Sequence, residues 1–297
     1  MNRMSLAAFA AICLPITSPA SANELEGKLS PTEVLAASEP SDWRALDPES
    51  LLYIELERGR VTVALSERLA QGHVGQIKAL AREGFYDGLS FYRVIDGFVA
   101  QGGDVFEKRE IKTAEKAVEA EFEEPFKEGN NFAAIKDVDG YAPVVGFVDG
   151  MPAGVDRDEN SIWLLHCAGA MAMARGNEKD TGGTEFYITL QPQRYLDRNL
   201  TVFGRVISGM EHLQALRRVS PPQSEEDDLG EIITSIRVAA DMPDEAQEEL
   251  EILRTETKTF QDYVEARRNR PEAFFYVRPD HADVCAINIP VRTAGEE

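Results

Sequence analysis

The chain is poor in basic residues and has no long hydrophobic run after its first twenty residues. Lys and Arg number 31 against 52 Asp and Glu, which gives a formal net charge of −21 over 297 residues. A field of this sign repels phosphate backbones and anionic lipid surfaces, so we expect no nucleic-acid partner. No later apolar run reaches the roughly 18 residues of a membrane-spanning helix, so we expect no membrane insertion once a leader has been removed.

Glycine and proline are also too scarce for a repetitive or low-complexity protein. The chain holds 22 Gly and 15 Pro, while 43% of its residues are hydrophobic and 28% are charged. These proportions are typical of globular proteins, and the length suits one large domain or two small ones. We therefore expect a folded protein with a sizeable core.

The first 22 residues have the pattern of a secretory signal. Arg3 supplies the positive start, residues 6–14 are apolar, and residues 20–22 form the small-residue cleavage site Ala-Ser-Ala. We expect cleavage after Ala22 and a periplasmic or secreted protein. The alternative is a lipoprotein anchored at Cys13, but the small residue that such an anchor needs before the cysteine is missing.

Two cysteines, Cys167 and Cys285, remain after removal of the signal. In an oxidising compartment a cysteine pair more often forms a disulfide than a metal site, and the chain has no CxxC motif. Closing a loop of this length would stabilise the fold by about 4 kcal/mol in the chain-entropy model. We predict a bridge between Cys167 and Cys285, with two buried free thiols as the alternative.

No other pattern indicates a metal or a cofactor. Residues 156–160 begin like a calcium-binding loop, but Ser161 stands where the turn glycine belongs. The four histidines lack the spacing of zinc ligands, and Gly182-Gly183 is not followed by the Lys and Ser/Thr of a phosphate-binding loop. We therefore expect neither a cofactor nor a metal.

Hydrophobic periodicity predicts many short strands and few helices. Alternation over 51–65 predicts a hairpin that turns at Arg58-Gly59, and helical spacing predicts a helix over 73–83. Further strands are predicted at 91–100, 162–165, 170–174, 185–190, 201–206 and 232–238, with a short helix near 210–216. No element is predicted within 104–160. The pattern favours an antiparallel barrel or sandwich.

The two ends of the chain are predicted to differ. Residues 23–50 contain three prolines and are predicted to form an irregular arm. After residue 240, an apolar stripe with acidic residues first and basic residues last predicts one helix over 243–268. Strands are predicted at 274–277 and 284–289. We expect this C-terminal extension, residues 241–297, to pack on the central domain and to be attached by the predicted disulfide.

Four blocks in the middle of the chain resemble the cyclophilin-type peptidyl-prolyl isomerases. Residues 85–104 read FYDGLSFYRVIDGFVAQGGD, close to the family's YDGxxFHRVIxGFMxQGGD. Residues 172–175 read AMAR for the family's SMAN, and residues 183–189 read GTEFYIT for its GSQFFIT. Residues 195–206 read YLDRNLTVFGRV for its WLDGxHxVFGxV. The resemblance covers roughly residues 51–238.

The resemblance implies a mainly β fold with a peptide groove. Residues 51–240 would form a closed eight-stranded antiparallel barrel capped by helices, and the C-terminal helix and strand extension would lie outside it. The groove on the outer face of the barrel would receive a prolyl peptide. The implied activity is peptidyl-prolyl cis-trans isomerisation in proline-containing exported polypeptides, and we expect a monomer.

The chemistry of this reaction explains which side chains it needs. Rotation about an X-Pro bond faces a barrier of roughly 20 kcal/mol because resonance stiffens the C–N bond, but no covalent step is required. A catalyst must bind the twisted imide more tightly than the planar one, with an apolar slot for the proline ring and a fixed donor beside the amide. Arg93 stands at the family's catalytic arginine and Gln101 at the glutamine that supports it.

The resemblance also assigns the substrate groove. The implied proline pocket consists of Phe98, Val99, Tyr187 and Leu196, with Leu200 at its edge, and Ala174, Arg175, Glu185 and Tyr195 occupy further groove positions. Each apolar member, considered alone, is better explained as a core residue.

Five groove positions depart from the family's usual residues. Val99 replaces Met, Leu200 replaces His, Tyr195 replaces Trp and Arg175 replaces Asn. The fifth, Glu185 for Gln, matters most, because a carboxylate near Arg93 either fixes the guanidinium or competes with the substrate carbonyl for it. We expect reduced but measurable activity. The alternative is a peptide-binding chaperone or assembly factor that uses the same groove without useful catalysis.

Overall fold

The computed structural model describes residues 27–127 and 131–295, and its centre is a closed barrel. The strands run in the order β11-β12-β5-β4-β14-β2-β3-β13, and all neighbours are antiparallel. Their bounds are β2 (Leu51–Leu56), β3 (Gly59–Leu65), β4 (Ser90–Val94), β5 (Val99–Gly103), β11 (Ala170–Met173), β12 (Phe186–Thr189), β13 (Val202–Ser208) and β14 (Glu231–Val238). The predicted eight-stranded barrel is confirmed.

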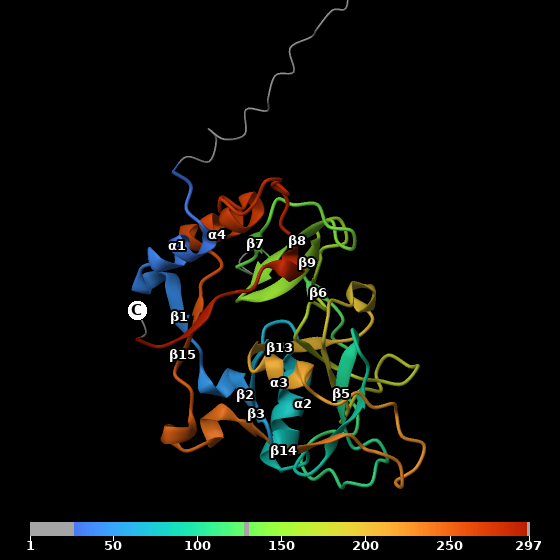
Figure 1. Ribbon diagram of the computed structural model, residues 1–297. Coiled ribbons are helices and arrows are strands. Elements are labelled where there is room, and N and C mark those ends of the chain that lie inside the picture. Colours follow the sequence, from blue (N-terminus) through green and yellow to red (C-terminus); the bar gives the residue numbers. More distant parts are fainter. Residues whose placement is uncertain (1–26, 128–130, 296–297) are drawn as a thin grey trace, which may run out of the picture.

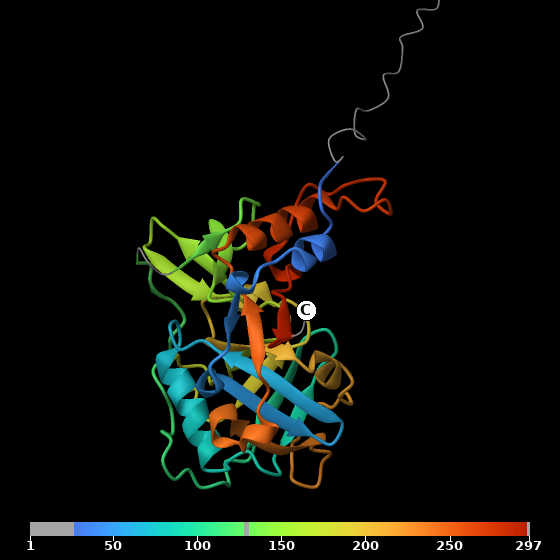
Figure 2. The same ribbon diagram turned by 90° about the vertical axis from the view of Figure 1, so that its left-hand side faces the viewer.

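Alternation along the strands fills the barrel with apolar side chains. Leu52 and Ile54 of β2 and Val63 of β3 are fully buried in this core. The helix α2 (Gln71–Arg82) contributes Ile77 and Leu80 to the same core, and the short helix α3 (Met210–Gln214) lies beside the barrel (Figure 2). The helices thus cap the barrel, as expected.

Four strands of a second sheet lie in the region for which no element was predicted, and the fifth, β10 (Ser161–Leu164), matches the strand predicted at 162–165. The sheet has the order β6-β10-β9-β8-β7, with β6 (Glu124–Pro125), β7 (Ala133–Ala134), β8 (Val144–Val148) and β9 (Met151–Asp156). Asp149 and Gly150 join β8 to β9 with φ of 50° and 84°. Two positive φ values are what a type I′ hairpin requires, so Asp-Gly between two apolar runs was an overlooked signal.

The prediction of one helix over 243–268 is wrong. A 3₁₀ turn (Asp244–Ala246) is followed by strand β15 (Leu250–Leu253), and the helix α4 covers only Lys258–Asn269. Leu253 pairs with Trp43 of strand β1 (Trp43–Ala45), more than two hundred residues away in sequence. This pairing overrides the local helical pattern, and Thr257 then caps α4 by accepting a hydrogen bond from the Phe260 amide.

Two other predictions at the chain ends are also wrong. The arm is not irregular throughout, because Ser30 and Glu33 form a capping box that starts helix α1 (Pro31–Ala36). No strand forms at 274–277, and residues 284–286 make a 3₁₀ turn; the last strand is β16 (Val291–Thr293), which pairs with β15. The other 3₁₀ turns are Pro40–Asp42, Pro48–Ser50, Arg194–Leu196 and Ala239–Asp241.

The arm, the inserted sheet and the C-terminal extension share a second core above the barrel. Val34 of α1, Phe147 of β8 and Phe260 of α4 belong to one buried apolar cluster. Figure 1 shows α1, α4, β7 and β8 together at one end of the molecule, with the barrel at the other. A disulfide joins Cys167 to Cys285, with 4.9 Å between the Cα atoms, and so ties this second unit to the segment that leads into β11.

The expected signal segment lies outside the described residues. Within the described ranges, no helix combines the length and the apolar character that crossing a membrane demands.

Candidate active site

Arg93 and Gln101 face each other across β4 and β5. The two residues are register partners, and Arg93 Nη1 donates a 2.9 Å hydrogen bond to Gln101 Oε1. The Arg93 guanidinium also lies 5.3 Å from the centre of the Phe98 ring. One hydrogen bond and one cation–π contact therefore hold the charged group beside an aromatic surface.

The side chains assigned to the proline pocket meet in one apolar cluster, which we call the proline notch: Phe98, Val99, Tyr187, Leu196 and Leu200. Val99 and Tyr187 are buried, with 2% and 5% of their surfaces exposed. Phe98, Leu196 and Leu200 are half-buried. Two members of the notch are therefore buried, and solvent reaches the other three.

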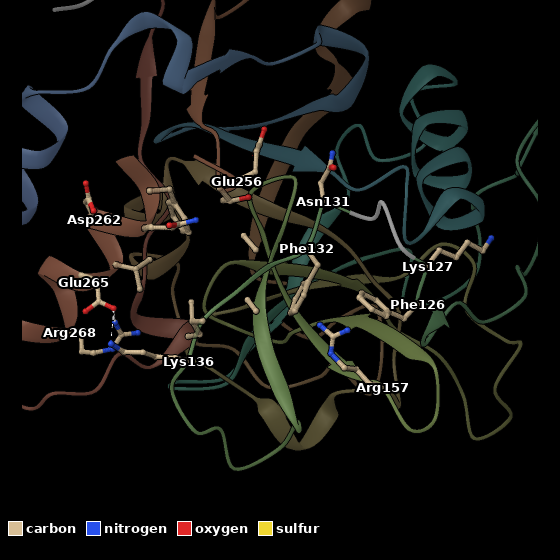
Figure 3. Close-up of a pocket in the computed structure, with 17 residues that line it drawn as sticks. Phe126, Lys127, Asn131, Phe132, Lys136, Arg157, Glu256, Asp262, Glu265 and Arg268 are labelled. Carbon is tan, nitrogen blue, oxygen red and sulfur yellow. Dashed lines mark hydrogen bonds and ion pairs between the residues drawn. The ribbon is translucent and has the colours of Figure 1, made fainter. Parts of the chain in front are cut away.

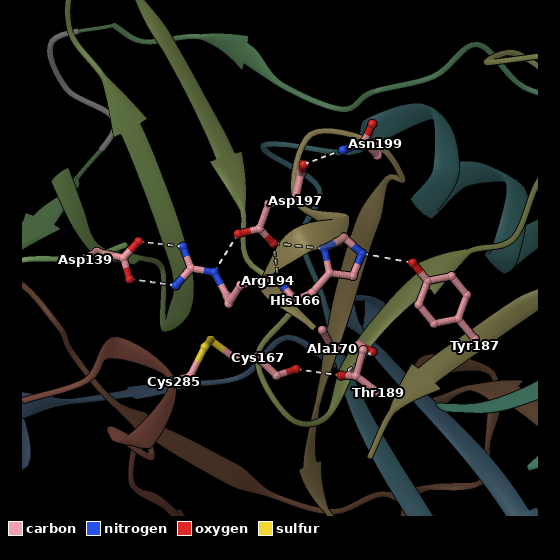
Figure 4. Close-up of polar contacts among 10 residues, drawn as sticks. All are labelled: Asp139, His166, Cys167, Ala170, Tyr187, Thr189, Arg194, Asp197, Asn199 and Cys285. Carbon is pink, nitrogen blue, oxygen red and sulfur yellow. Dashed lines mark hydrogen bonds and ion pairs between the residues drawn. A yellow bond between two sulfur atoms is a disulfide. The ribbon is translucent and has the colours of Figure 1, made fainter. Parts of the chain in front are cut away.

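Tyr187, where the family has Phe, is anchored through its hydroxyl group. The hydroxyl lies 2.9 Å from His166 Nε2, and His166 Nδ1 lies 3.0 Å from Asp197 Oδ1 (Figure 4). The ring of His166 is completely buried. A buried hydroxyl left without a partner would be costly, and here the histidine satisfies it.

The same network fixes the turn that carries Leu196. Arg194 Nε donates to Asp197 Oδ2 at 2.6 Å, and its two terminal nitrogens donate to the carboxylate of Asp139 at 2.8 and 2.9 Å. These contacts place two pocket residues, Tyr187 and Leu196, on one rigid framework. Sequence reasoning missed His166, Arg194 and Asp197; the tyrosine in place of phenylalanine was the signal that a polar partner existed.

Glu185 is enclosed beside this site and makes no ion pair with Arg93 in the described chain. Neither of its buried carboxylate oxygens has a hydrogen-bond partner of good geometry there. Burial raises the pKa of the Glu185 carboxyl to about 7, and the carboxylate of Asp104 adds to the rise, while the nearby Tyr92 hydroxyl opposes it. Glu185 thus titrates near neutral pH.

Tyr92 connects Glu185 to the arginine. Gln101 Nε2 donates a hydrogen bond to the Tyr92 hydroxyl oxygen. Because that oxygen accepts from Gln101, its own hydrogen is left for the nearby Glu185. The donors therefore run in one direction, from Arg93 through Gln101 and Tyr92 toward the carboxyl group.

A cavity of about 790 Å³ opens next to Gln101 and is lined by Tyr92, Ala174, Arg175 and Glu185 among others. The Arg175 guanidinium donates to the carbonyl oxygens of Asn199, Gly176 and Asn177, so its donors are already used within the chain. Tyr195 is 59% exposed. The cavity is therefore a polar chamber beside Gln101, and Ala174 both lines it and packs against the apolar cluster that contains the notch.

The protein thus contains a closed antiparallel barrel, and Arg93 is held beside the apolar residues of the proline notch. The sequence profile described as "Cyclophilin type peptidyl-prolyl cis-trans isomerase/CLD" matches residues 51–238. The chain therefore belongs to the cyclophilin-type peptidyl-prolyl cis-trans isomerases, and it is an enzyme of that activity.

Relatives from several bacteria agree with this family. A "Probable peptidyl-prolyl cis-trans isomerase" of Brucella suis is 29% identical over 180 residues, which cover 61% of this chain and 78% of the relative. "Peptidyl-prolyl cis-trans isomerase B" of Bacillus subtilis is 36% identical over 160 residues, which cover 54% of this chain and 85% of the relative. The crystal structure of cyclophilin AquaCyp293 from Hirschia baltica superposes with a TM-score of 0.71 at 27% identity, covering 91% of this chain and all of that one.

Proposed function

We propose that Arg93 accelerates X-Pro rotation by stabilising the twisted imide. The observation that carries this is the guanidinium fixed by Gln101 at 2.9 Å and seated on the ring of Phe98. When the peptide bond twists, resonance is lost and the prolyl nitrogen regains its lone pair, which a fixed guanidinium N–H can bind. The planar imide offers no such lone pair, so the interaction strengthens at the top of the barrier and lowers it.

The proline notch supplies the other half of the mechanism. It holds the proline ring while the preceding residue rotates, so the side chains of the notch must keep their positions. The bonds from Tyr187 through His166 to Asp197 support this rigidity. Reaction then requires no covalent bond to form or break, and the enzyme acts by differential binding alone.

The test is an isomerase assay on a prolyl tetrapeptide, with wild type compared with Arg93→Ala. We expect kcat/KM to fall on the order of 100-fold, the usual loss when one fixed transition-state donor is removed. Arg217→Ala is the matched control, because Arg217 is an exposed arginine paired with Asp228 and lies outside the groove. Equal activity of the wild type and the Arg93 variant would refute the role of the guanidinium.

A second candidate is peptide binding with little catalysis. Glu185 favours it, because an unpartnered carboxylate stands where the family has a neutral amide. In that case the wild type would bind the tetrapeptide but leave its isomerisation at the uncatalysed rate.

We propose further that the clients are exported polypeptides and that the enzyme works on them as a monomer outside the cytoplasm. The leader pattern at residues 1–22 and the disulfide support this location. Uncatalysed prolyl isomerisation takes tens of seconds, which is slow enough to limit the folding of such clients.

A further inference from the structure

The short strand β7 is an open edge of the inserted sheet. Among the described residues β7 pairs only with β8, so its other edge has no partner strand there. Its other side faces a cavity of about 740 Å³, which residues 132–136 line without interruption. We call this cavity the β7–α4 groove.

The register shows that backbone donors and acceptors point into the groove. The Ile135 amide donates to the Val145 carbonyl oxygen, so Ile135 belongs to a hydrogen-bonded pair of the antiparallel ladder. Ala134 lies opposite Gly146 and belongs to the alternate pair, whose N–H and C=O groups point away from the partner strand. Ala134 is exposed, so these two groups are available to another strand.

Helix α4 forms the opposite wall. Phe260, Val264 and Arg268 recur every four residues and face the groove. Arg268 is 2% exposed and bonds the carboxylate of Asp137, and Phe260 packs edge-to-face on Phe147 at 5.3 Å. The wall is therefore rigid. In Figure 3 the α4 residues Glu265 and Arg268 lie on one side, with Phe132, Phe126 and Arg157 on the other.

Two polar groups along the groove lack a partner within the described chain. The hydroxyl group of Thr255 is buried, with 1% of the residue exposed, and makes no hydrogen bond there. Arg157 lies over the Phe126 ring at 5.2 Å, and no ion pair is found for it among those residues. By contrast, Lys136 pairs with Glu265 at 2.9 Å. An occupant that brings an acceptor and a negative charge would satisfy both groups.

We propose that the β7–α4 groove binds an extended, unfolded segment of the client polypeptide, which adds a strand to the edge of β7. Adding a strand recruits the peptide backbone, so it tolerates many sequences and suits a folding enzyme. Apolar client side chains would contact the half-buried rings of Phe126 and Phe132, and an acidic one would face Arg157.

The position of the groove beside the apolar cluster of the proline notch favours a client as the occupant. Phe126 and Phe132, at the border of the groove, pack against the same apolar cluster as Phe98 and Leu196 of the notch. Both sites therefore border one apolar cluster, and each offers half-buried apolar side chains at that border. A second copy of this protein is disfavoured, because two chains of charge −21 repel each other. The inference rests on the proposed function, since it takes the occupant to be the isomerase's client.

The test compares Ala134→Pro with Ala134→Ser. Proline removes the outward N–H and blocks strand addition, yet it costs no bond to β8, because this N–H is not part of the ladder. Serine keeps the N–H and serves as the matched control. We expect Ala134→Pro to bind a reduced, carboxymethylated ribonuclease about tenfold more weakly, the loss expected for two unmade hydrogen bonds. Catalysis of proline-limited ribonuclease refolding should fall, and tetrapeptide activity should stay at the wild-type value.

Hydrogen exchange provides a measurement that needs no variant. The unfolded ribonuclease should slow exchange of the Ala134 and Lys136 amides of the wild-type enzyme. Unchanged exchange, or equal binding by the proline and serine variants, would overturn the inference while leaving tetrapeptide isomerisation intact. Concentration-dependent dimers that protect the same amides would assign the edge to a second copy instead. A wild type that binds the unfolded ribonuclease at this edge but has no tetrapeptide activity would refute the proposed function and leave the strand-addition site standing.

Discussion

At the scale of single residues, one substitution sets the electrostatics of the groove. A neutral amide at position 185 would offer donors to its surroundings, whereas a carboxylate in the same enclosure offers only acceptors and a charge. Burial in this enclosure raises the pKa of Glu185 to about 7, so the carboxyl group keeps its proton below that pH. A protonated Glu185 has a donor, as glutamine does, and thus restores part of the family's pattern below neutral pH.

Glu185→Gln should therefore remove a pH dependence. We expect the ratio of wild-type to variant kcat/KM to fall as pH rises from 6 to 8, because over this range the wild type gains a charge beside Tyr92, which Gln101 links to Arg93, and the variant does not. Exchange NMR on an Ala-Pro peptide measures the rates without a coupled protease. A ratio that stays constant with pH would contradict the idea.

The same group predicts how stability responds to pH. The folded-state pKa of about 7 is higher than the ordinary value of 4.5, so the folded protein holds the proton more strongly than the unfolded chain. The stability that this proton provides is complete below pH 4.5 and is lost as pH rises to 7. Urea midpoints of the wild type should decline over that window more than those of Glu185→Gln.

At the scale of elements, β15 and α4 show how pairing over a long distance decides secondary structure. Leu250 and Ile252 alternate with acidic residues, a pattern that fits both a helix turn and a short strand. The strand forms because β1 and β16 flank it and supply its hydrogen bonds. The disulfide joins the 3₁₀ turn that contains Cys285 to Cys167, which lies just before barrel strand β11.

Removing that disulfide should loosen the second unit without abolishing catalysis. Because the bridge spans 118 residues, the double change Cys167→Ala with Cys285→Ala should lower the free energy of unfolding by about 2–4 kcal/mol. Urea denaturation measures this loss, and the tetrapeptide assay should remain near the wild-type rate because Arg93 and Gln101 lie on barrel strands. Identical urea midpoints of the two proteins would show that the bridge adds no stability.

At the scale of the whole molecule, three segments far apart in sequence make one body beside the catalytic barrel. The arm, the inserted sheet and the C-terminal extension bury a shared core that includes Trp43, Trp163 and Phe260. Their joint core positions α4 against β7 and so creates the groove proposed as a second client site.

The leader pattern at residues 1–22 predicts the fate of the whole chain in the cell. We expect the protein expressed in a bacterium to reach the periplasm and to begin at Asn23, since the leader would be cleaved after Ala22. N-terminal sequencing of the periplasmic fraction checks this. Recovery of the full-length chain in the cytoplasm would contradict the assignment, and a lipid-modified Cys13 would favour the lipoprotein alternative.

The sequence by itself indicated many short strands, and its resemblance to the family implied the closed barrel and the groove residues, because alternating strands and the block around Arg93 and Gln101 are local patterns. It also singled out Glu185 as the departure of greatest consequence. Only the tertiary structure decided how Tyr187 is anchored, since His166 and Asp197 reach it from separate loops. It likewise decided that Leu253 pairs with Trp43, because no local pattern specifies which distant backbone completes a strand's hydrogen bonds.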